Sequence, residues 1–117
     1  MSREIVRYDP DTRLSDMVEY DGTLYLAGQV GEDATVGIKE QTESILRQID
    51  KLLARGGSDK SKILSAVVYV ADMRLKTKMD EAWLAWMDAK SSPARACVEA
   101  RLGSADTLVE IMCVASK

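Results

Sequence analysis

Two charged residues near the end of the sequence stand among small and apolar neighbours, and their types suggest anion binding and acid–base chemistry. Arg95 lies within SSPARACVEA (residues 91–100), and Glu110 lies within LVEIMC (residues 108–113). Arginine is almost never fully buried without a partner, so Arg95 requires an anion. Its planar guanidinium suits a carboxylate, and Glu110 is able to orient or deprotonate water. The pair describes a site where water attacks a small carboxylic acid.

The histidine and cysteine content of the sequence excludes several kinds of catalytic and metal site. The sequence contains no histidine, which removes the commonest general base and metal ligand and excludes a Ser-His-Asp triad. We expect no metal site. Cys97 and Cys113 show neither disulfide nor metal-ligand spacing, so we expect a reduced protein in the cytoplasm.

Length and charge limit the class of protein. The 117 residues fit one domain (1–117) with one core. No apolar run approaches the ~20 residues of a membrane span, and no signal peptide is visible, so we expect no membrane partner. The net charge is −3 and no basic cluster is dense, which argues against a nucleic-acid partner.

Periodicity and turn signals predict the order β-β-β-α-β-α-β-β. Strands are expected at 4–8, 17–20, 23–26, 63–70, 94–102 and 107–115, with a tight turn at Asp21–Gly22. A helical stripe marks 35–54, and a second helix is expected after a cap at Asp72, with its stripe running from Leu75 to Trp86. The predicted fold is α+β: a two-layer sandwich with two helices on one face of a single mixed sheet.

Strand 63–70 is apolar on both faces, with Leu64, Ala66, Val68 and Val70 expected on one of them. Two helices cover only one face of a sheet, so the other face is expected to be an interface. We therefore infer a homo-oligomer in which sheets pack face to face.

Alternation along the last two strands predicts where the charged pair lies. It assigns Ala94, Ala96, Val98 and Ala100 to the helix side and turns Arg95, Cys97, Glu99 and Glu110 toward the uncovered face. If a turn joins these strands directly, Glu99 lies opposite Glu110, and Arg95 lies roughly 13 Å further along. The pair then either forms an ion pair across a subunit boundary or binds a small ligand.

Several segments resemble the RidA/YjgF family of enamine/imine deaminases. The most specific are PARACVEARL (93–102) and VEI (109–111); weaker matches are LYLAGQVGED (24–33), residues 40–64 and VVYVADM (67–73). The resemblance covers nearly the whole chain. It implies a chorismate-mutase-like fold, a homotrimer with ligand sites between subunits, and hydrolysis of 2-imino acids to 2-keto acids and ammonia without a cofactor.

The resemblance also assigns roles. Arg95 matches the arginine that grips the substrate carboxylate, and Glu110 matches the acid that holds the water. Cys97 matches a cysteine whose main chain contacts ligand, and Gly28 matches the glycine of an S-G-Q turn. These residues, with Leu14 and Asp80, form the predicted site for a small 2-imino or 2-keto acid.

Two of these positions depart from the family pattern. Leu14 replaces a tyrosine that lines the pocket, and Asp80 replaces an asparagine, adding a carboxylate that would repel an acid substrate. These departures favour the alternative of a trimer that binds or senses small carboxylates without turnover. Ribonuclease activity or translation inhibition is disfavoured by the acidic charge, and chorismate mutase chemistry needs a more basic site.

Overall fold

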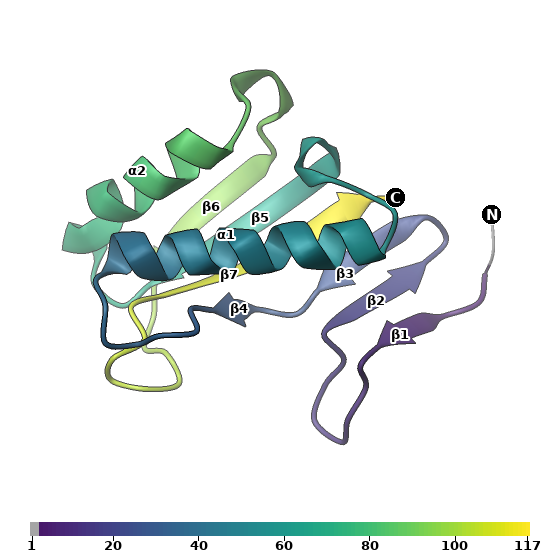
Figure 1. Cartoon of the computed structure of the whole chain (residues 1–117), viewed down its shortest axis with the longest axis horizontal. Helices are drawn as coiled ribbons and strands as arrows, with labels where there is room; N and C mark the ends of the chain where they lie inside the picture. The colour runs from purple at the N-terminus through teal and green to yellow at the C-terminus, as the bar shows by residue number, and fades with distance from the viewer. Residues whose placement is uncertain (1–2) are drawn as a thin grey trace.

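The structure is a computed structural model that describes residues 3–117, and these form one seven-stranded mixed sheet with two α-helices on one face (Figure 1). The predicted α+β two-layer fold is confirmed. The strands are β1 (Val6–Tyr8), β2 (Met17–Tyr20), β3 (Thr23–Leu26), β4 (Gln29–Val30), β5 (Ile63–Val70), β6 (Ala94–Glu99) and β7 (Val109–Ser116). The helices are α1 (Ile38–Arg55) and α2 (Lys76–Trp86), and single 3₁₀ turns are η1 (Lys60–Lys62), η2 (Met73–Leu75) and η3 (Ala89–Ser91).

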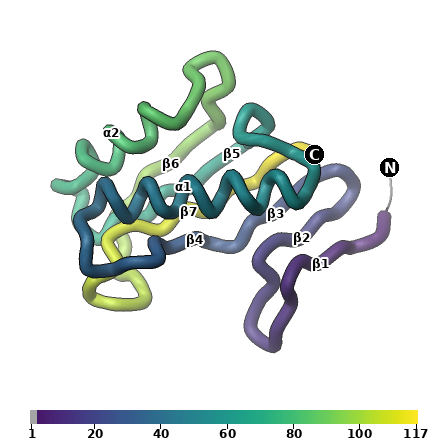
Figure 2. The backbone as a smooth tube through the Cα atoms, in the orientation of Figure 1, coloured from purple at the N-terminus to yellow at the C-terminus, as the bar shows by residue number. Residues whose placement is uncertain are grey.

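The strand order is β1-β2-β3-β7-β5-β6, and the short β4 also pairs with β7. β5 and β6 are parallel, whereas the other pairs are antiparallel. The expectation that a turn joins β6 and β7 as neighbours is wrong, because β5 lies between them. A strand that is apolar on both faces belongs in the centre of a sheet, and the β5-α2-β6 crossover makes β6 a parallel edge strand. The tube in Figure 2 shows α2 and the β1–β2 pair at opposite ends of the molecule.

β5 begins with an irregularity that reverses one prediction. Its register against β7 shifts between Ile63 and Ser65, as in a β-bulge. Ile63 is therefore buried together with Ala66, Val68 and Val70, while Leu64 is 53% exposed. Strict alternation predicts the opposite placement of Ile63 and Leu64, because it does not allow for the extra residue.

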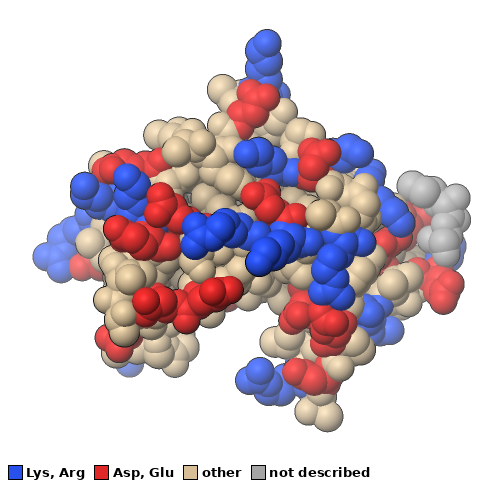
Figure 3. All heavy atoms as spheres, viewed as in Figure 1, with Lys and Arg blue, Asp and Glu red and all other residues tan. Residues whose placement is uncertain are grey.

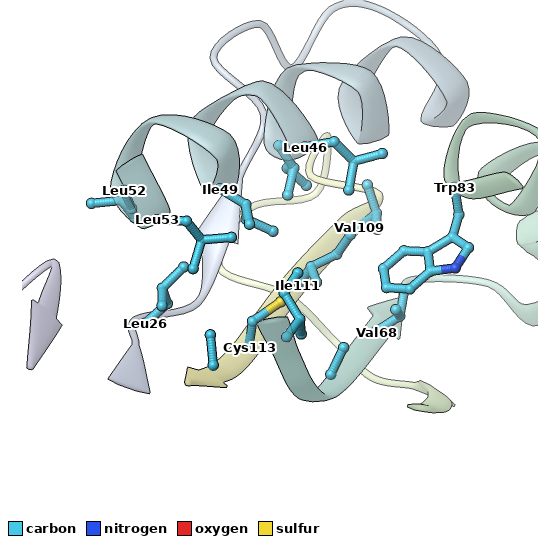
Figure 4. Close-up of a cluster of buried hydrophobic side chains, with 14 of the residues drawn as sticks. Leu26, Leu46, Ile49, Leu52, Leu53, Val68, Trp83, Val109, Ile111 and Cys113 are labelled. Carbon is cyan, nitrogen blue, oxygen red and sulfur yellow. The ribbon is translucent and has the colours of Figure 1, made fainter. Parts of the chain in front are cut away.

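The core lies between the helices and the sheet. Figure 4 shows side chains of α1 pointing toward Val109 and Ile111 of β7, with Trp83 of α2 beside Val68. The α1 side chains that face the sheet lie at the helical spacing predicted within 35–54: Ile38, Gln41, Ile45, Leu46, Ile49, Leu52 and Leu53. The helix-facing residues of β7 are Val109, Ile111, Cys113 and Ala115. Burial raises the pKa of the Cys113 thiol to about 12, so this cysteine packs as a small neutral residue.

Helix α2 is held at both ends by side chains. The Asp72 carboxylate accepts a hydrogen bond from the Arg74 N–H at 2.9 Å, which caps the η2 turn that leads into α2, as the sequence predicts. At the other end, the Lys60 ammonium donates to the Trp86 carbonyl at 2.6 Å. A cation is favourable there because the last carbonyls of a helix carry partial negative charge. The first contact caps the turn that precedes α2, and the second joins the end of α2 to η1.

Gln41 is the polar member of the α1 stripe, and it is only 1% exposed. Its amide nitrogen donates to the carbonyls of Val36 and Asp106 at 2.9 and 3.0 Å, and its Oε1 accepts from the Leu108 N–H at 3.0 Å. The side chain thus ties the start of α1 to the loop before β7 and satisfies main-chain groups that would otherwise lack partners.

Replacing Gln41 by leucine is expected to lower the free energy of unfolding by about 2–3 kcal/mol, because buried main-chain groups lose their partners without access to water. Urea unfolding measures the change. Gln48→Leu is the matched control on the same helix: Gln48 is half-buried and water is able to replace its bond to the Val30 carbonyl. Equal losses in the two variants would contradict the role assigned to Gln41.

The sheet face opposite the helices carries exposed apolar side chains. Val98 of β6 and Met112 of β7 are 41% and 39% exposed, and Tyr25 and Val30 are also exposed. An apolar sheet face of this kind is typical of an interface. The predicted homotrimer, with this face buried between subunits, stays a prediction.

Candidate functional site

Arg95 lies under helix α2, on the helix-facing side of β6. It pairs in register with Ala66, which is 3% exposed and faces the helices. Its Nη1 donates to Oδ1 of Asp80 at 2.8 Å, and its guanidinium carbon lies 5.0 Å from the centre of the Trp83 ring. The prediction that Arg95 and Cys97 point to the uncovered face is therefore wrong.

The error has a physical cause. Ala94, Ala96 and Val98 are small, so a simple apolar–polar alternation assigned them to the core, yet all are exposed. The helix side of β6 instead accommodates a cation because α2 places an aromatic face and a carboxylate above it. Edge strands such as β6 are where this inversion is tolerated, since one side of the strand meets solvent.

Asp80 bridges two cations. Its Oδ1 accepts from Arg95, and its Oδ2 accepts from the Lys76 ammonium at 2.7 Å, one helical turn earlier on α2. The Asp80 and Arg95 side chains are 19% and 21% exposed. Burial by itself would raise the pKa of Asp80, but the hydrogen bonds from Lys76 and Arg95 outweigh it and the pKa lies below its ordinary value. Asp80 is therefore ionised at neutral pH.

Cys97 completes this cluster. Burial raises the pKa of its thiol, while the charges of Arg95 and Lys76 act to lower it and the charge of Asp80 acts to raise it. All three charged groups thus act at the sulfur atom. We name Lys76, Asp80, Trp83, Arg95 and Cys97 the β6–α2 cluster.

The main chain of β6 adds hydrogen-bonding groups to the cluster. The Ala100 N–H donates to the Val70 carbonyl on β5. Because main-chain groups alternate in direction along a strand, the N–H and C=O groups of Arg95, Cys97 and Glu99 point to the free edge of β6. The main chain of Cys97 is thus positioned to contact a ligand at this edge, as the resemblance implies.

Glu110 and Gly28 meet on the other face of the sheet. Glu110 of β7 pairs in register with Tyr69 of β5 and with Val30 of β4. The Glu110 carboxylate lies so close to Gly28 that a Cβ at this position would overlap Oε2. β4, which the sequence did not predict, holds the chain after Gly28 against β7 and so creates this close approach.

Gly28→Ala is expected to displace the Glu110 carboxylate while lowering the free energy of unfolding by less than about 1 kcal/mol, since the overlapping atoms end a flexible side chain. The measurements are a crystal structure for the carboxylate position and a thermal melt for stability. Gly103→Ala is the control, because nothing lies within 4 Å of a Cβ there. A Glu110 carboxylate that stays in place would contradict the expected contact.

Leu14 lies apart from both groups. It is 45% exposed and sits in the loop between β1 and β2, which Asp11 closes by accepting hydrogen bonds from the N–H groups of Arg13 and Leu14 at 2.7 and 2.9 Å. In the sheet order, β1 and β2 are at the opposite end from β6. One chain therefore brings Arg95, Asp80 and Cys97 together, brings Gly28 and Glu110 together, and leaves Leu14 alone.

Two members of the cluster were not predicted. Lys76 and Trp83 flank Asp80 at positions i−4 and i+3 on α2, and residues at these spacings share one face of a helix. This spacing in the sequence indicates that Lys76, Asp80 and Trp83 share one face of the helix.

Among residues 3–117, no three His, Cys, Asp or Glu side chains gather as metal ligands would, and neither helix has the length and apolar character of a membrane span.

Comparison with known proteins decides the family. The profile of the family described as Endoribonuclease L-PSP matches residues 4–117. The chain belongs to this family. A RutC family protein of Haemophilus ducreyi is 42% identical over 112 residues, covering 96% of both chains. The RutC family protein YoaB of Escherichia coli is also 42% identical, covering 96% of this chain and 97% of the relative.

A solved structure agrees with the family assignment. A member of the YjgF protein family from Neisseria meningitidis superimposes with a TM-score of 0.93 at 42% identity, over 98% of this chain and 96% of the other. The resemblance to the RidA/YjgF family is therefore confirmed, and this chain shares the fold of that structure.

Proposed function

We propose that this protein hydrolyses reactive 2-imino acids and their enamine tautomers to 2-keto acids and ammonia, at a carboxylate-binding site between subunits. The observation that carries the proposal is the half-buried Arg95 guanidinium at the free edge of β6, held by Asp80 and stacked on Trp83. A guanidinium fixed in this way is preorganised to bind a carboxylate, because little rotamer freedom is lost on binding.

The proposed reaction adds water to the carbon–nitrogen double bond. Arg95 binds the substrate carboxylate, and Glu110 holds a water molecule and takes its proton as the oxygen bonds to C2. Glu110 passes that proton to the nitrogen, which gives a carbinolamine with OH and NH2 on C2. The hydroxyl proton then moves through Glu110 to the nitrogen, the carbon–nitrogen bond breaks, and ammonia leaves as the C2 carbonyl forms. Water is the only co-reactant.

Within one chain the two proposed residues cannot act together. Arg95 lies on the helix side of β6, whereas Glu110 lies on the opposite sheet face and two strands away. The proposal therefore needs a second subunit that brings its Glu110, and its Leu14, to the edge of β6. The exposed apolar sheet face supports such an assembly, and the resemblance implies that it is a homotrimer.

The name of the family raises RNA cleavage as a different activity. The chain is acidic, with a net charge of −3. Figure 3 shows Lys and Arg side chains in a band across the middle of the helix-bearing face, with Asp and Glu side chains above and below it. This band is narrower than the broad basic surface that RNA backbones favour. We therefore place imine hydrolysis ahead of RNA cleavage.

A binding role without turnover is the second candidate, and one observation favours it. The Asp80 carboxylate already accepts a hydrogen bond from Nη1 of Arg95, so a ligand carboxylate competes with a carboxylate of the protein. In this role the oligomer would hold or sense small carboxylic acids.

A single assay separates these functions. An amino-acid oxidase generates 2-iminopropionate from alanine, and semicarbazide traps the imine that has not yet been hydrolysed. We expect the wild-type protein to lower the trapped fraction and Glu110→Gln to lower it far less. Saturable binding of pyruvate with no effect on imine decay would establish the binding role instead. Cleavage of a labelled RNA would establish ribonuclease activity.

A further inference from the structure

Asp80 divides its two carboxylate oxygens between two cations. Oδ1 accepts from Nη1 of Arg95 at 2.8 Å, and Oδ2 accepts from Nζ of Lys76 at 2.7 Å. A carboxylate that met Arg95 alone would be free to take two parallel guanidinium N–H groups, which is the geometry arginine prefers. Lys76 holds the second oxygen and so limits Asp80 to one bond with Arg95.

The consequence for Arg95 is geometric. Among the described residues, Asp80 is the hydrogen-bond partner of the Arg95 side chain, through Nη1 only. The edge of the guanidinium formed by Nε and Nη2 keeps its two parallel donors for an incoming carboxylate. The guanidinium carbon lies 5.0 Å from the centre of the Trp83 ring, so the group packs on Trp83 and this edge keeps a fixed direction.

The net charge of Lys76, Asp80 and Arg95 also favours the binding of a carboxylate. Asp80 alone would cancel the charge of Arg95 and leave a neutral site that does not attract an acid. Two cations and one carboxylate leave a single positive charge in the cluster. This charge matches a ligand with one carboxylate, such as a 2-imino acid with an uncharged side chain.

We propose that Lys76 is a positioning residue that keeps Arg95 available to a monocarboxylate ligand, by holding Oδ2 of Asp80 and offsetting its charge. The proposal rests on the proposed function, since it concerns the same carboxylate site. An ordinary i,i+4 pair on a helix surface would have no such effect on ligand binding. Lys76 differs because its partner is mostly buried and also bonded to Arg95.

Four variants test the role of Lys76 through the dissociation constant of pyruvate, measured by isothermal titration calorimetry. We expect Lys76→Met to bind pyruvate about 5- to 10-fold more weakly than wild type, and Lys76→Arg to stay within about twofold because it keeps the charge and donors. Asp80→Asn should bind about fivefold more tightly. The double variant Lys76→Met/Asp80→Asn should bind within about twofold of Asp80→Asn, because the carboxylate that Lys76 restrains is gone.

These outcomes distinguish Lys76 from a direct ligand contact or a structural residue. If Lys76 touched pyruvate itself, the double variant would bind about 5- to 10-fold more weakly than Asp80→Asn. If Lys76 only stabilised α2, Lys76→Met would lower the melting temperature and leave the dissociation constant unchanged. Either result would overturn the proposal.

A crystal structure of Lys76→Met without ligand tests the geometry independently of activity. We expect both oxygens of Asp80 on the Arg95 guanidinium in this variant and one in Lys76→Arg. An unchanged single bond in Lys76→Met overturns the inference even if imine hydrolysis is established. The expected rearrangement in a protein that neither binds pyruvate nor hydrolyses imines would confirm how Lys76 acts on Arg95 and refute the proposed function alone.

Discussion

Replacing Arg95 by alanine is expected to lower kcat/KM for 2-iminopropionate by about 100- to 1000-fold, which corresponds to about 3–4 kcal/mol. The variant loses the donors that would bind the substrate carboxylate and leaves the Asp80 carboxylate beside the site with Lys76 as its remaining partner. The site changes from net positive to neutral, so substrate binding and orientation are both affected. Trapping of residual imine by semicarbazide measures the rate.

Arg95→Lys is the matched control for this effect. It keeps the charge and the contact with Asp80 but lacks the planar pair of donors, so we expect a loss of about tenfold. Thermal melts should show both variants folded, because β6 is an edge strand and Lys76 still neutralises Asp80. Equal rates for wild type and Arg95→Ala would refute the deaminase proposal at this site.

Replacing Trp83 by alanine is expected to lower the free energy of unfolding by about 3–5 kcal/mol, the largest stability effect we predict. Trp83 is 5% exposed and belongs to the core between α2 and β5. Its ring meets Trp86 edge to face at 5.7 Å and lies against the Arg95 guanidinium. The substitution therefore removes core contacts and the support of the anion site together. Urea denaturation at pH 7 measures the loss.

The neighbouring residue provides the control. Leu84 lies next to Trp83 on α2 but is 73% exposed, so Leu84→Ala should change the free energy of unfolding by no more than about 0.5 kcal/mol. A small loss for Trp83→Ala, comparable to that of Leu84→Ala, would show that the tryptophan is not a core residue.

The positions of the main elements follow from the sequence because their signals are local. The predicted strands 17–20, 23–26 and 63–70 have the bounds of β2, β3 and β5. The stripe from Ile38 to Leu53 is buried along α1, since a 3.6-residue period requires only that one side of the helix meets a core. The residue types identify Arg95 and Glu110 as candidate residues, and the family resemblance adds Cys97.

The arrangement of the site was decided by tertiary structure. The sequence does not show that β5 lies between β6 and β7, because strand order depends on which apolar faces gain most by burial across the whole sheet. It also does not show that Arg95 faces α2. Its neighbours are small enough to fit either side of an edge strand, so alternation carried little information there.

The anion that Arg95 meets in this chain is likewise a tertiary feature. Asp80 is fifteen residues away, and its contact depends on how the anchored α2 lies across β6. Local sequence determines that Lys76, Asp80 and Trp83 share one face of α2. Only the packing of α2 on the sheet places that face against the Arg95 guanidinium. The reason is that short-range backbone preferences act along the chain, whereas the partner of a half-buried charge is chosen by the burial of both elements together.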